Sequence, residues 1–517
     1  MSEKMQSTIL DNGSGSGSHV EDGGSHHDHI DPEKSSSSDG ADGNAKLDPH
    51  GLPLAPQPSD FKDDPLNWPR WMKWMVLLQV SFMALLGPFN AAVPNPSLTL
   101  LSKAFKHPVE IVTYSTTTAI ITGGLSPFLW VPLSNVVGRR PMCLITQLVT
   151  VVTHVATART TTFAQLVGVR AINGIGFGGM MALGTPVLND MFFMHERGEM
   201  TGVYTIFVTN GAHIAVLCGG FLGQYAGWRW DFYMPAIVTG VSFLVALFLL
   251  PETLFSRGPR FLAERTHERS YMEMLFNFKG NLIPQRRLKG QDFLTSFYML
   301  KYPSVSLPFW FYTLSWTFIN ILPAISMAKI YGARYGFASG KIGLCTGIPL
   351  IIGCVIGEIS GGKLSDIIVY RLAKKNGGRA KPEHRLYLTC ISAILGPTGM
   401  IIFGVCLQKN YSYIVPLVGL AVGVCGLQIT STCLYAYLSD CYRPQTPESA
   451  VLMNLGRGLS FVVGFWWSPM VAKIGYAWTW SSQALILLVF WFPILALMIK
   501  GEGWRKKLGA PSFHQYS

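Results

Sequence analysis

Apolar stretches of membrane-spanning length alternate with polar segments from about residue 71 to residue 500. The hydrocarbon core of a bilayer is about 30 Å thick, so a helix needs about 20 mainly apolar residues to cross it. Twelve stretches meet this length, near residues 73–95, 112–134, 141–158, 163–188, 201–223, 231–250, 305–328, 342–362, 386–406, 412–438, 448–471 and 479–499. The pattern predicts an all-α membrane protein with twelve transmembrane helices.

The polar segments divide the helices into two sets of six. The N-terminal segment is rich in Gly, Ser, Asp and His and poor in large apolar side chains, which predicts a disordered tail. Its cluster His26–His29 contains metal-binding side chains, but a solvated polar tail is the favoured interpretation. The predicted regions are a cytosolic tail at 1–65, a six-helix bundle at 66–252, a central loop at 253–303, a second six-helix bundle at 304–500 and a tail at 501–517.

The two sets of six helices carry a short internal similarity. The second helix ends in Pro132–Asn135 and the eighth ends in Lys363–Asp366, and both strings contain Leu-Ser followed by Asn or Asp. Their equivalent places predict two pseudo-symmetric six-helix halves. Paired repeats with a site near the middle of the membrane are a transporter architecture.

Composition and charge agree with this architecture. Only 14% of the residues are charged, against about a quarter in soluble domains. The net charge of +12 does not indicate nucleic-acid binding, because the basic residues gather in alternate loops, which predicts that these loops and both termini are cytosolic. The basic residues of these loops are Arg139, Arg140, Arg197, Arg257, Arg260, Arg265, Arg269, Arg286, Arg287, Arg371, Lys374, Lys375, Arg379, Lys381, Arg385, Arg443, Arg505, Lys506 and Lys507.

Several strings between Asp64 and about Lys500 carry a family resemblance. They are Asp64–Pro69 before the first helix, Gly138–Pro141 after the second, Gly227–Trp230 and Pro251–Thr253 around the sixth, and Arg371–Gly378 and Pro382–Leu386 after the eighth. Together they resemble the major facilitator superfamily, and more narrowly its fungal twelve-helix drug:proton antiporters. The resemblance implies the major facilitator fold and export of small organic molecules such as xenobiotics or secondary metabolites. It also implies a plasma-membrane location, with the vacuolar membrane as the alternative.

The loop after the second helix resembles the superfamily's signature loop, which ties neighbouring helices together. A carboxylate at a helix end can pair with an arginine and latch one conformation. Asn135 replaces the acid expected there, whereas Asp366 keeps it in the second half. Asn135, Arg139, Arg140 and Asp366 are therefore candidate latch residues. The alternative is that the two arginines only determine topology.

Three titratable side chains inside the apolar stretches are candidates for proton coupling. Arg170 lies about two turns inside the fourth helix, where a guanidinium costs at least about 2.5 kcal/mol and needs a partner. The string Arg170–Gly176 resembles the family's fourth-helix motif, whose arginine is associated with proton coupling. His213 can titrate near neutral pH, and Glu358 can be the exchanged acid. The alternatives are an arginine bonded to helix-end carbonyls, a neutral histidine bonded to Asn210 or a carbonyl, and a glutamate paired with Lys363.

Glycines mark two helices. In the fourth helix, Gly174 and Gly178 predict close helix packing, and no strand precedes them to suggest a dinucleotide loop. In the fifth helix, four glycines resemble the antiporter signature and permit sliding contact with the opposite half. They are Gly202, Gly211, Gly219 and Gly220. Ala215-Val216 replaces the Gly-Pro of that signature, which weakens the prediction of antiport.

Aromatic and amide side chains in the helices predict a central substrate cavity, because such side chains supply contact area and orientation. Lipid-facing packing is the alternative for the aromatic ones. The candidates are Asn90, Asn210, Tyr312, Trp316, Asn320, Gln428, Tyr435 and Asn454. Asn410 begins a glycosylation sequon in a predicted outside loop, but its closeness to the membrane disfavours its use.

The function predicted from these features is transport rather than catalysis. An enzyme would need an acid–base pair or metal ligands in one cavity, and the scattered candidates form no such set. We expect a proton-coupled exporter that works as a monomer in the bilayer on a small-molecule substrate, without cofactor, metal or nucleic acid. An importer of a cation or nutrient, and a non-transporting sensor with the same fold, remain the alternatives.

Overall fold

The computed structural model describes residues 46, 54, 56–257, 262, 267–276, 288–375, 381–442, 445–509 and 511. Residues Leu54–Ser517 form one compact unit, which contains all the membrane helices discussed below. Most of the predicted tail at 1–65 lies outside the described residues, as do much of the central loop and the basic residues Arg260, Arg265, Arg286, Arg287, Arg379 and Arg443.

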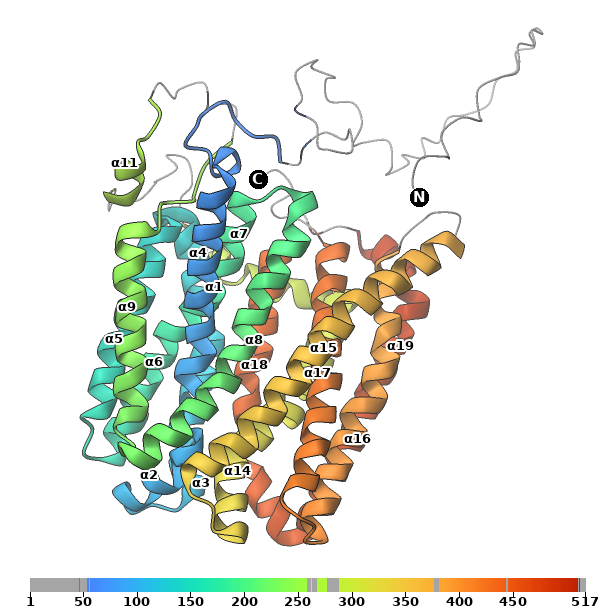
Figure 1. Cartoon of the computed structure of the whole chain (residues 1–517). Coiled ribbons are helices and arrows are strands. Elements are labelled where there is room, and N and C mark those ends of the chain that lie inside the picture. Colours follow the sequence, from blue (N-terminus) through green and yellow to red (C-terminus); the bar gives the residue numbers. More distant parts are fainter. Residues whose placement is uncertain are drawn as a thin grey trace, which may run out of the picture. The chain divides into compact units, whose positions relative to one another are not determined.

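Six crossings form the first half (Figure 1). After the short η1 (Pro65–Asn67), they are α1 (Arg70–Ala92), α3 (Val109–Leu125) with α4 (Pro127–Val137), α5 (Arg139–Ala158), α6 (Phe163–Ala182) with α7 (Gly184–Met191), α8 (Met194–Tyr225) and α9 (Trp230–Leu249). The short η2 (Asn95–Ser97) and α2 (Leu98–Phe105) join α1 to α3. The central loop contributes α11 (Tyr271–Phe276), η3 (Gly290–Phe293), α12 (Thr295–Tyr298) and η4 (Met299–Lys301).

Six further crossings form the second half. They are α13 (Pro303–Ser315) with η5 (Trp316–Ile321) and α14 (Leu322–Tyr335), α15 (Ser339–Lys375), η6 (Pro382–Leu388) with α16 (Thr389–Gln408), α17 (Ile414–Cys441), α18 (Thr446–Leu459) with η8 (Ser460–Val462) and the start of α19 (Val463–Leu508), and the rest of α19. Gly475, at φ +78°, breaks the helical geometry inside α19. The eleven long apolar helices of the described residues, together with the shorter α18, therefore account for the twelve predicted crossings.

The same pairs of crossings pack in both halves. The second crossing packs on the fourth (α3 on α6) as the eighth packs on the tenth (α15 on α17), and α5 packs on α9 as α16 packs on α19. The halves meet where α8 packs on α15 and α3 packs on α18; α8 and α15 run together through the middle of Figure 1. This arrangement confirms the two pseudo-symmetric halves.

The outer faces of the helices carry the apolar side chains expected of a lipid contact. On α9, Ile237, Val241, Leu244 and Phe248 are all exposed and recur every three or four residues, so they form one stripe. Polar side chains instead concentrate inside, where Arg140, Arg170 and His154 are buried. The low charge of the chain thus reflects a surface that faces lipid.

One predicted helix boundary is wrong in a way that affects the site. The eighth helix was expected at 342–362, but α15 continues to Lys375. Glu358 therefore lies well inside α15 rather than a turn from its end. The continuation is polar enough to leave the bilayer, so hydropathy alone does not detect it.

Candidate functional site

A cavity of about 90 Å³ lies between the halves, at the middle of the crossing helices. Its walls are mainly apolar, and both halves contribute to them. They include Pro88, Ala91, Ile120, Phe177, Val208 and Val216 from the first half and Trp316, Ile321, Ala324 and Leu350 from the second. Its polar lining residues are Asn95, Thr209, His213, Asn320, Asn454 and Arg457. An apolar chamber with a few polar groups is typical of a small-molecule site.

Glycines allow the halves to meet closely around this cavity. A Cβ on Gly220 of α8 would lie 2.6 Å from the carbonyl oxygen of Ser339, and one on Gly458 of α18 would lie 2.7 Å from the Cα of Gly124. Such distances exclude any side chain. The backbones of α8 and α15, and those of α3 and α18, are therefore in direct contact.

The other predicted glycines have different neighbours. Within the same half, Gly211 approaches the carbonyl oxygen of Leu85 in α1, and Gly219 approaches that of Val93, just after α1. A Cβ on Gly202 would meet nothing within 4 Å. Of the four fifth-helix glycines, Gly220 alone faces the opposite half, so the expected sliding surface is shorter than predicted. Gly174 and Gly178 of α6 lie against the backbone and side chains of α3.

A hydrogen bond crosses the cavity between the halves. The Nε2 atom of His213 on α8 lies 3.4 Å from Oδ1 of Asn320, and both residues are buried. Asn320 lies in η5, a π-helical turn between α13 and α14. Such turns are rare and are found frequently at functional sites, because they redirect side chains. The structure thus brings together two residues that the sequence proposed for different roles.

Arg457 on α18 also lines the cavity, and the sequence analysis missed it. Its Nε donates to the Tyr312 hydroxyl at 2.6 Å, and its Nη1 lies 3.6 Å from the sulfur of Met181 in the other half. Its guanidinium carbon lies 4.5 Å from the centre of the Trp316 ring, a cation–π distance. The signal was present, since an arginine lay about ten residues inside the predicted helix at 448–471.

Arg170 lies inside the first half and is not among the residues that line the cavity. Its Nη1 donates to the carbonyl of Asn90 at 3.3 Å and to Oδ1 of Asn173 at 3.0 Å, and its Nη2 donates to the carbonyl of Ala91 at 3.2 Å. Those carbonyls belong to the last turn of α1, the negative end of the helix dipole. The guanidinium also lies 5.6 Å from the Phe232 ring. These are the contacts of an arginine bonded to helix-end carbonyls.

Glu358 lies inside the second half, between α15 and α17. Its carboxylate accepts hydrogen bonds from the amide of Gln428 and, at 3.2 Å, from the hydroxyl of Thr432. No contact with Lys363 is seen among the described residues. Glu358 and Gln428 therefore form one polar cluster outside the cavity lining, rather than an acid at the interface and an amide at the substrate.

The remaining cavity candidates divide by position. Asn454 lines the cavity, as Trp316 and Asn320 do. Tyr312 and Tyr435 lie behind it, with their rings 5.7 Å apart, and Tyr312 holds Arg457. Asn90 donates to Thr239 at 3.3 Å inside the first half, and Asn210 donates to the carbonyl of Ile206 on its own helix.

The candidate latch of the first half is a compact cluster at the predicted cytosolic face. Arg139 donates to Oδ1 of Asn135 at 2.5 Å and to the carboxylate of Asp190, at the end of α7, at 3.0 Å. The carboxylate of Glu252 accepts the backbone N–H groups of Arg139 and Arg140 at 2.9 and 3.2 Å. Burial raises the pKa of Glu252, against the effect of these hydrogen bonds.

The candidate latch of the second half uses the equivalent positions. Arg385, at the start of the ninth crossing, donates to Asp366 at 3.1 Å and to Asp440, at the end of α17, at 2.5 Å. Glycine makes the corresponding turn of the first half possible, since Gly138 has φ +125°. Both clusters therefore join the ends of three crossings through one arginine.

On the predicted outer face, a second polar cluster joins the halves. Lys329 of α14 forms an ion pair with Glu110 of α3 and donates to Ser468 of α19 at 2.8 Å. Ser468 also donates to Glu110 at 3.1 Å. Asn410, the sequon residue, lies on the same face and accepts from Arg334.

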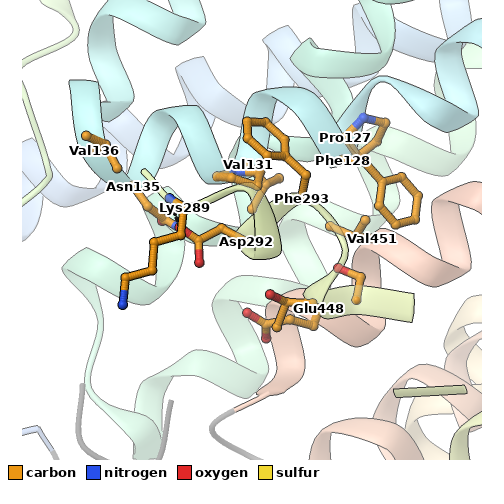
Figure 2. Close-up of a pocket in the computed structure, with 13 residues that line it drawn as sticks. Pro127, Phe128, Val131, Asn135, Val136, Lys289, Asp292, Phe293, Glu448 and Val451 are labelled. Atoms are coloured by element: carbon orange, nitrogen blue, oxygen red, sulfur yellow. Dashed lines mark hydrogen bonds between the residues drawn. The ribbon is translucent and has the colours of Figure 1, made fainter. Parts of the chain in front are cut away.

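A larger pocket of about 380 Å³ lies at the predicted cytosolic face, between α4, α18 and the central-loop segments η3 and α12. Figure 2 shows Phe128, Val131 and Phe293 along one wall, with the carboxylates of Asp292 and Glu448 opposite. A small apolar cluster of Val131, Ala182 and Val451 lies on the helices that continue into the central cavity. The pocket and the cavity thus follow one interface, and Val131 and Val451 of this cluster line the pocket.

Two bundles of six helices around a shared cavity are the architecture of a secondary transporter. Residues 80–465 match the sequence profile of the Major Facilitator Superfamily, and the chain belongs to that superfamily. It is 26% identical over 463 residues to "Uncharacterized transporter mfc1" of Schizosaccharomyces pombe, covering 86% of this chain and 93% of that one. It is 27% identical over 416 residues to "Efflux pump radE" of Floropilus chiversii, covering 77% of this chain and 75% of that one.

The fold is also that of solved transporters. A crystal structure of a D-xylose-proton symporter aligns with a TM-score of 0.61 at 16% identity, covering 83% of this chain and 97% of the symporter. At this identity the likeness shows the fold alone. With the sequence relatives, it confirms the family resemblance to fungal efflux transporters and the twelve-helix fold.

Proposed function

We propose that this transporter exports small organic molecules from the cytosol in exchange for protons, by alternating access of the central cavity to the two faces. The observation that carries the proposal is the cavity itself, which is apolar, mid-membrane and built from both halves. A rocking motion of the halves about this cavity changes the face to which it opens. The working unit is a single chain in the plasma membrane, with both termini in the cytosol.

The name of a relative supports the direction of transport, and the structure indicates a path for the substrate. The relative from Floropilus chiversii is named an efflux pump. In this chain, the outer side of the interface is joined by Glu110 and Lys329, whereas the predicted cytosolic side has a pocket below the cavity. A substrate from the cytosol would enter through that pocket and pass the apolar cluster at Val131 and Val451.

His213 is our candidate for the proton carrier. It lines the cavity and meets Asn320 of the opposite half, so a change in its protonation acts on a contact between the halves. Protonation makes both ring nitrogens donors, which changes what the pair accepts from a substrate. Arg170 and Glu358 are tied to neighbours within single halves, and we assign them supporting roles.

The test uses the purified chain in proteoliposomes with a panel of labelled organic probes and an imposed pH gradient. We expect accumulation that stops when an ionophore collapses the gradient. His213→Gln should lose gradient-driven accumulation but keep substrate exchange at equal pH. Thr205→Val, a change on the same helix but outside the cavity lining, should keep both.

Each alternative has its own result. Normal accumulation by His213→Gln would place coupling elsewhere, and Arg170→Ala and Glu358→Gln are then the next variants. Accumulation in the opposite direction would indicate an importer. Probe binding without flux in either direction would indicate a sensor.

A further inference from the structure

Arg457 has a charge that the described protein does not neutralise. Its oxygen partner is the Tyr312 hydroxyl, and its other hydrogen-bond acceptor among the described residues is the sulfur of Met181, which is a weak one. Among the residues that the structure describes, no carboxylate forms an ion pair with Arg457. The cavity lining itself contains neither Asp nor Glu.

Arg457 differs from Arg170 in its hydrogen-bond partners. Both arginines lie within the membrane, but the Nη atoms of Arg170 donate to three oxygens, from Asn90, Ala91 and Asn173. Neither Nη atom of Arg457 donates to an oxygen of the described residues. Both Nη atoms of Arg170 are therefore bound by oxygens of its own half, although its Nε has no partner among the described residues. The Nη atoms of Arg457 keep donors for another group.

The aromatic contacts do not remove the need for that group. A guanidinium inside a membrane costs several kcal/mol unless a counter-charge or water compensates it. Its cation–π contact with Trp316 at 4.5 Å offsets part of this cost, and together with the hydrogen bond from Nε to Tyr312 it holds the guanidinium in place. A fixed planar fork is suited to bind two oxygens of one carboxylate.

The rest of the cavity restricts the molecule that carries the oxygens. Its walls are apolar, and Asn320 and Asn454 supply the amides. The lining therefore matches an apolar body with one acidic group, and it offers no acid to hold an amine. His213 is the other lining residue that can carry charge, and its charge would also be positive.

We infer that the transported molecule is a small organic anion, whose carboxylate or equivalent acidic oxygen pairs with Arg457 in the central cavity. This inference rests on the proposed function and names the substrate class of the same site. Arg457 is then a specificity-determining residue, held in place by Tyr312 and Trp316.

The first test compares three probes of one shape on the purified full chain: naphthoate, naphthamide and naphthylmethylamine. Binding is measured by the ligand-dependent rise in melting temperature. Naphthoate should bind about tenfold or more tightly than the amide, as expected of a hydrogen bond to a charged group, and the amine should bind most weakly. Equal binding of the three probes, preference for the amine, or no binding of the acid would overturn the inference.

The second test removes the charge. Arg457→Gln should weaken naphthoate binding about tenfold and leave the amide within about twofold. Arg457→Lys should restore part of the preference for the acid. If Arg457→Gln does not fold, the Arg457→Lys variant and the probe series on the unaltered chain still decide the question.

Proteoliposome flux separates this inference from the proposed function. Gradient-driven export of naphthamide or the amine that is insensitive to Arg457→Lys would support the proposed export function and contradict the inferred anionic substrate. Arg457-dependent binding of naphthoate without flux would support the inferred anion-binding site and contradict the proposed export function.

Discussion

The arginine clusters at the predicted cytosolic ends of the two halves share a plan but differ in charge. In the first half, Arg139 is held by an amide, Asn135, and one carboxylate, Asp190. In the second, Arg385 is held by two carboxylates, Asp366 and Asp440. A serine from the preceding helix also meets each arginine, at 2.7 Å in the first half and 3.5 Å in the second.

Burial explains the difference in charge. The Arg139 and Asp190 side chains are 8% and 20% exposed, whereas Asp366 is 73% exposed. In the less exposed cluster, Asp190 already balances the guanidinium and Glu252 accepts the backbone N–H groups of Arg139 and Arg140, so a further carboxylate would add repulsion that offsets its attraction to the arginine. In the exposed cluster, water solvates the extra carboxylate. The missing acid at position 135 is thus compensated by Asp190 rather than lost.

Replacing the central arginine of each cluster should change the free energy of unfolding most, and so tests this comparison most directly. Arg139→Ala should lower the free energy of unfolding by about 3 kcal/mol, because it leaves the carboxylate of Asp190, which is only 20% exposed, without its counter-charge. Arg385→Ala should cost about 1 kcal/mol, because water can replace the lost partner. Thermal melting of the purified variants measures both. Equal losses, or a larger loss for Arg385→Ala, would contradict the role of burial.

A second prediction concerns a further anchor of the first half. Asp64, which is buried, accepts from Arg257 at 2.6 and 3.2 Å and from the backbone of Ser59 and Leu66. Burial alone would raise the pKa of this carboxyl, but Arg257 and the backbone donors outweigh it and lower the pKa below the ordinary 3.8. The carboxylate therefore stabilises the fold above that pH, and the contribution is lost as the pH falls through the lowered value.

Asp64→Asn should cost about 2 kcal/mol at neutral pH, since the hydrogen bonds to Arg257 lose their charge. The difference in melting temperature between the unaltered chain and the variant should narrow as the pH falls from 3.8 through the lowered pKa, below which the unaltered carboxyl is also neutral in the folded chain. Asp366→Asn, at an exposed carboxylate, provides the control. A difference that stays constant with pH would show that Asp64 acts through shape rather than charge.

The sequence was sufficient for the fold but not for the partners of its charges. Length and hydropathy predicted the twelve crossings, because the bilayer imposes both. The cluster partners of Arg139 are different: Asp190 lies 51 residues away and was overlooked because it ends a helix, where an acid is ordinary. Lys329 and Glu110 lie 219 residues apart, and no local pattern relates them.

The site shows the same limit. Trp316, Asn320, Asn454 and His213 were predicted as polar or aromatic groups inside helices, and the structure brings them to one cavity. Gln428 satisfied the same criterion but turns to Glu358. Which face of a helix lines the cavity depends on the packing between the halves. A helix that is apolar on all faces gives no hydropathy signal for that orientation.

The smallest effect is expected from exchanging the two residues that distinguish the clusters. Asn135→Asp adds a carboxylate to Arg139, whose charge Asp190 already balances, so attraction to the arginine and repulsion from Asp190 nearly cancel. Asp366→Asn removes an exposed carboxylate while Asp440 remains on Arg385. Each change should shift the free energy of unfolding by less than about 0.5 kcal/mol.

The exchange is informative because it separates charge from geometry. Asp190→Asn should be clearly destabilising alone, and Asn135→Asp in the same chain should recover part of the loss, because the carboxylate returns to the other side of Arg139. Melting of the two single variants and the double variant gives their coupling. Additive effects would mean that residues 135 and 190 do not both interact with Arg139. The two halves would then be equivalent in backbone structure but not in the side-chain contacts of their arginine clusters.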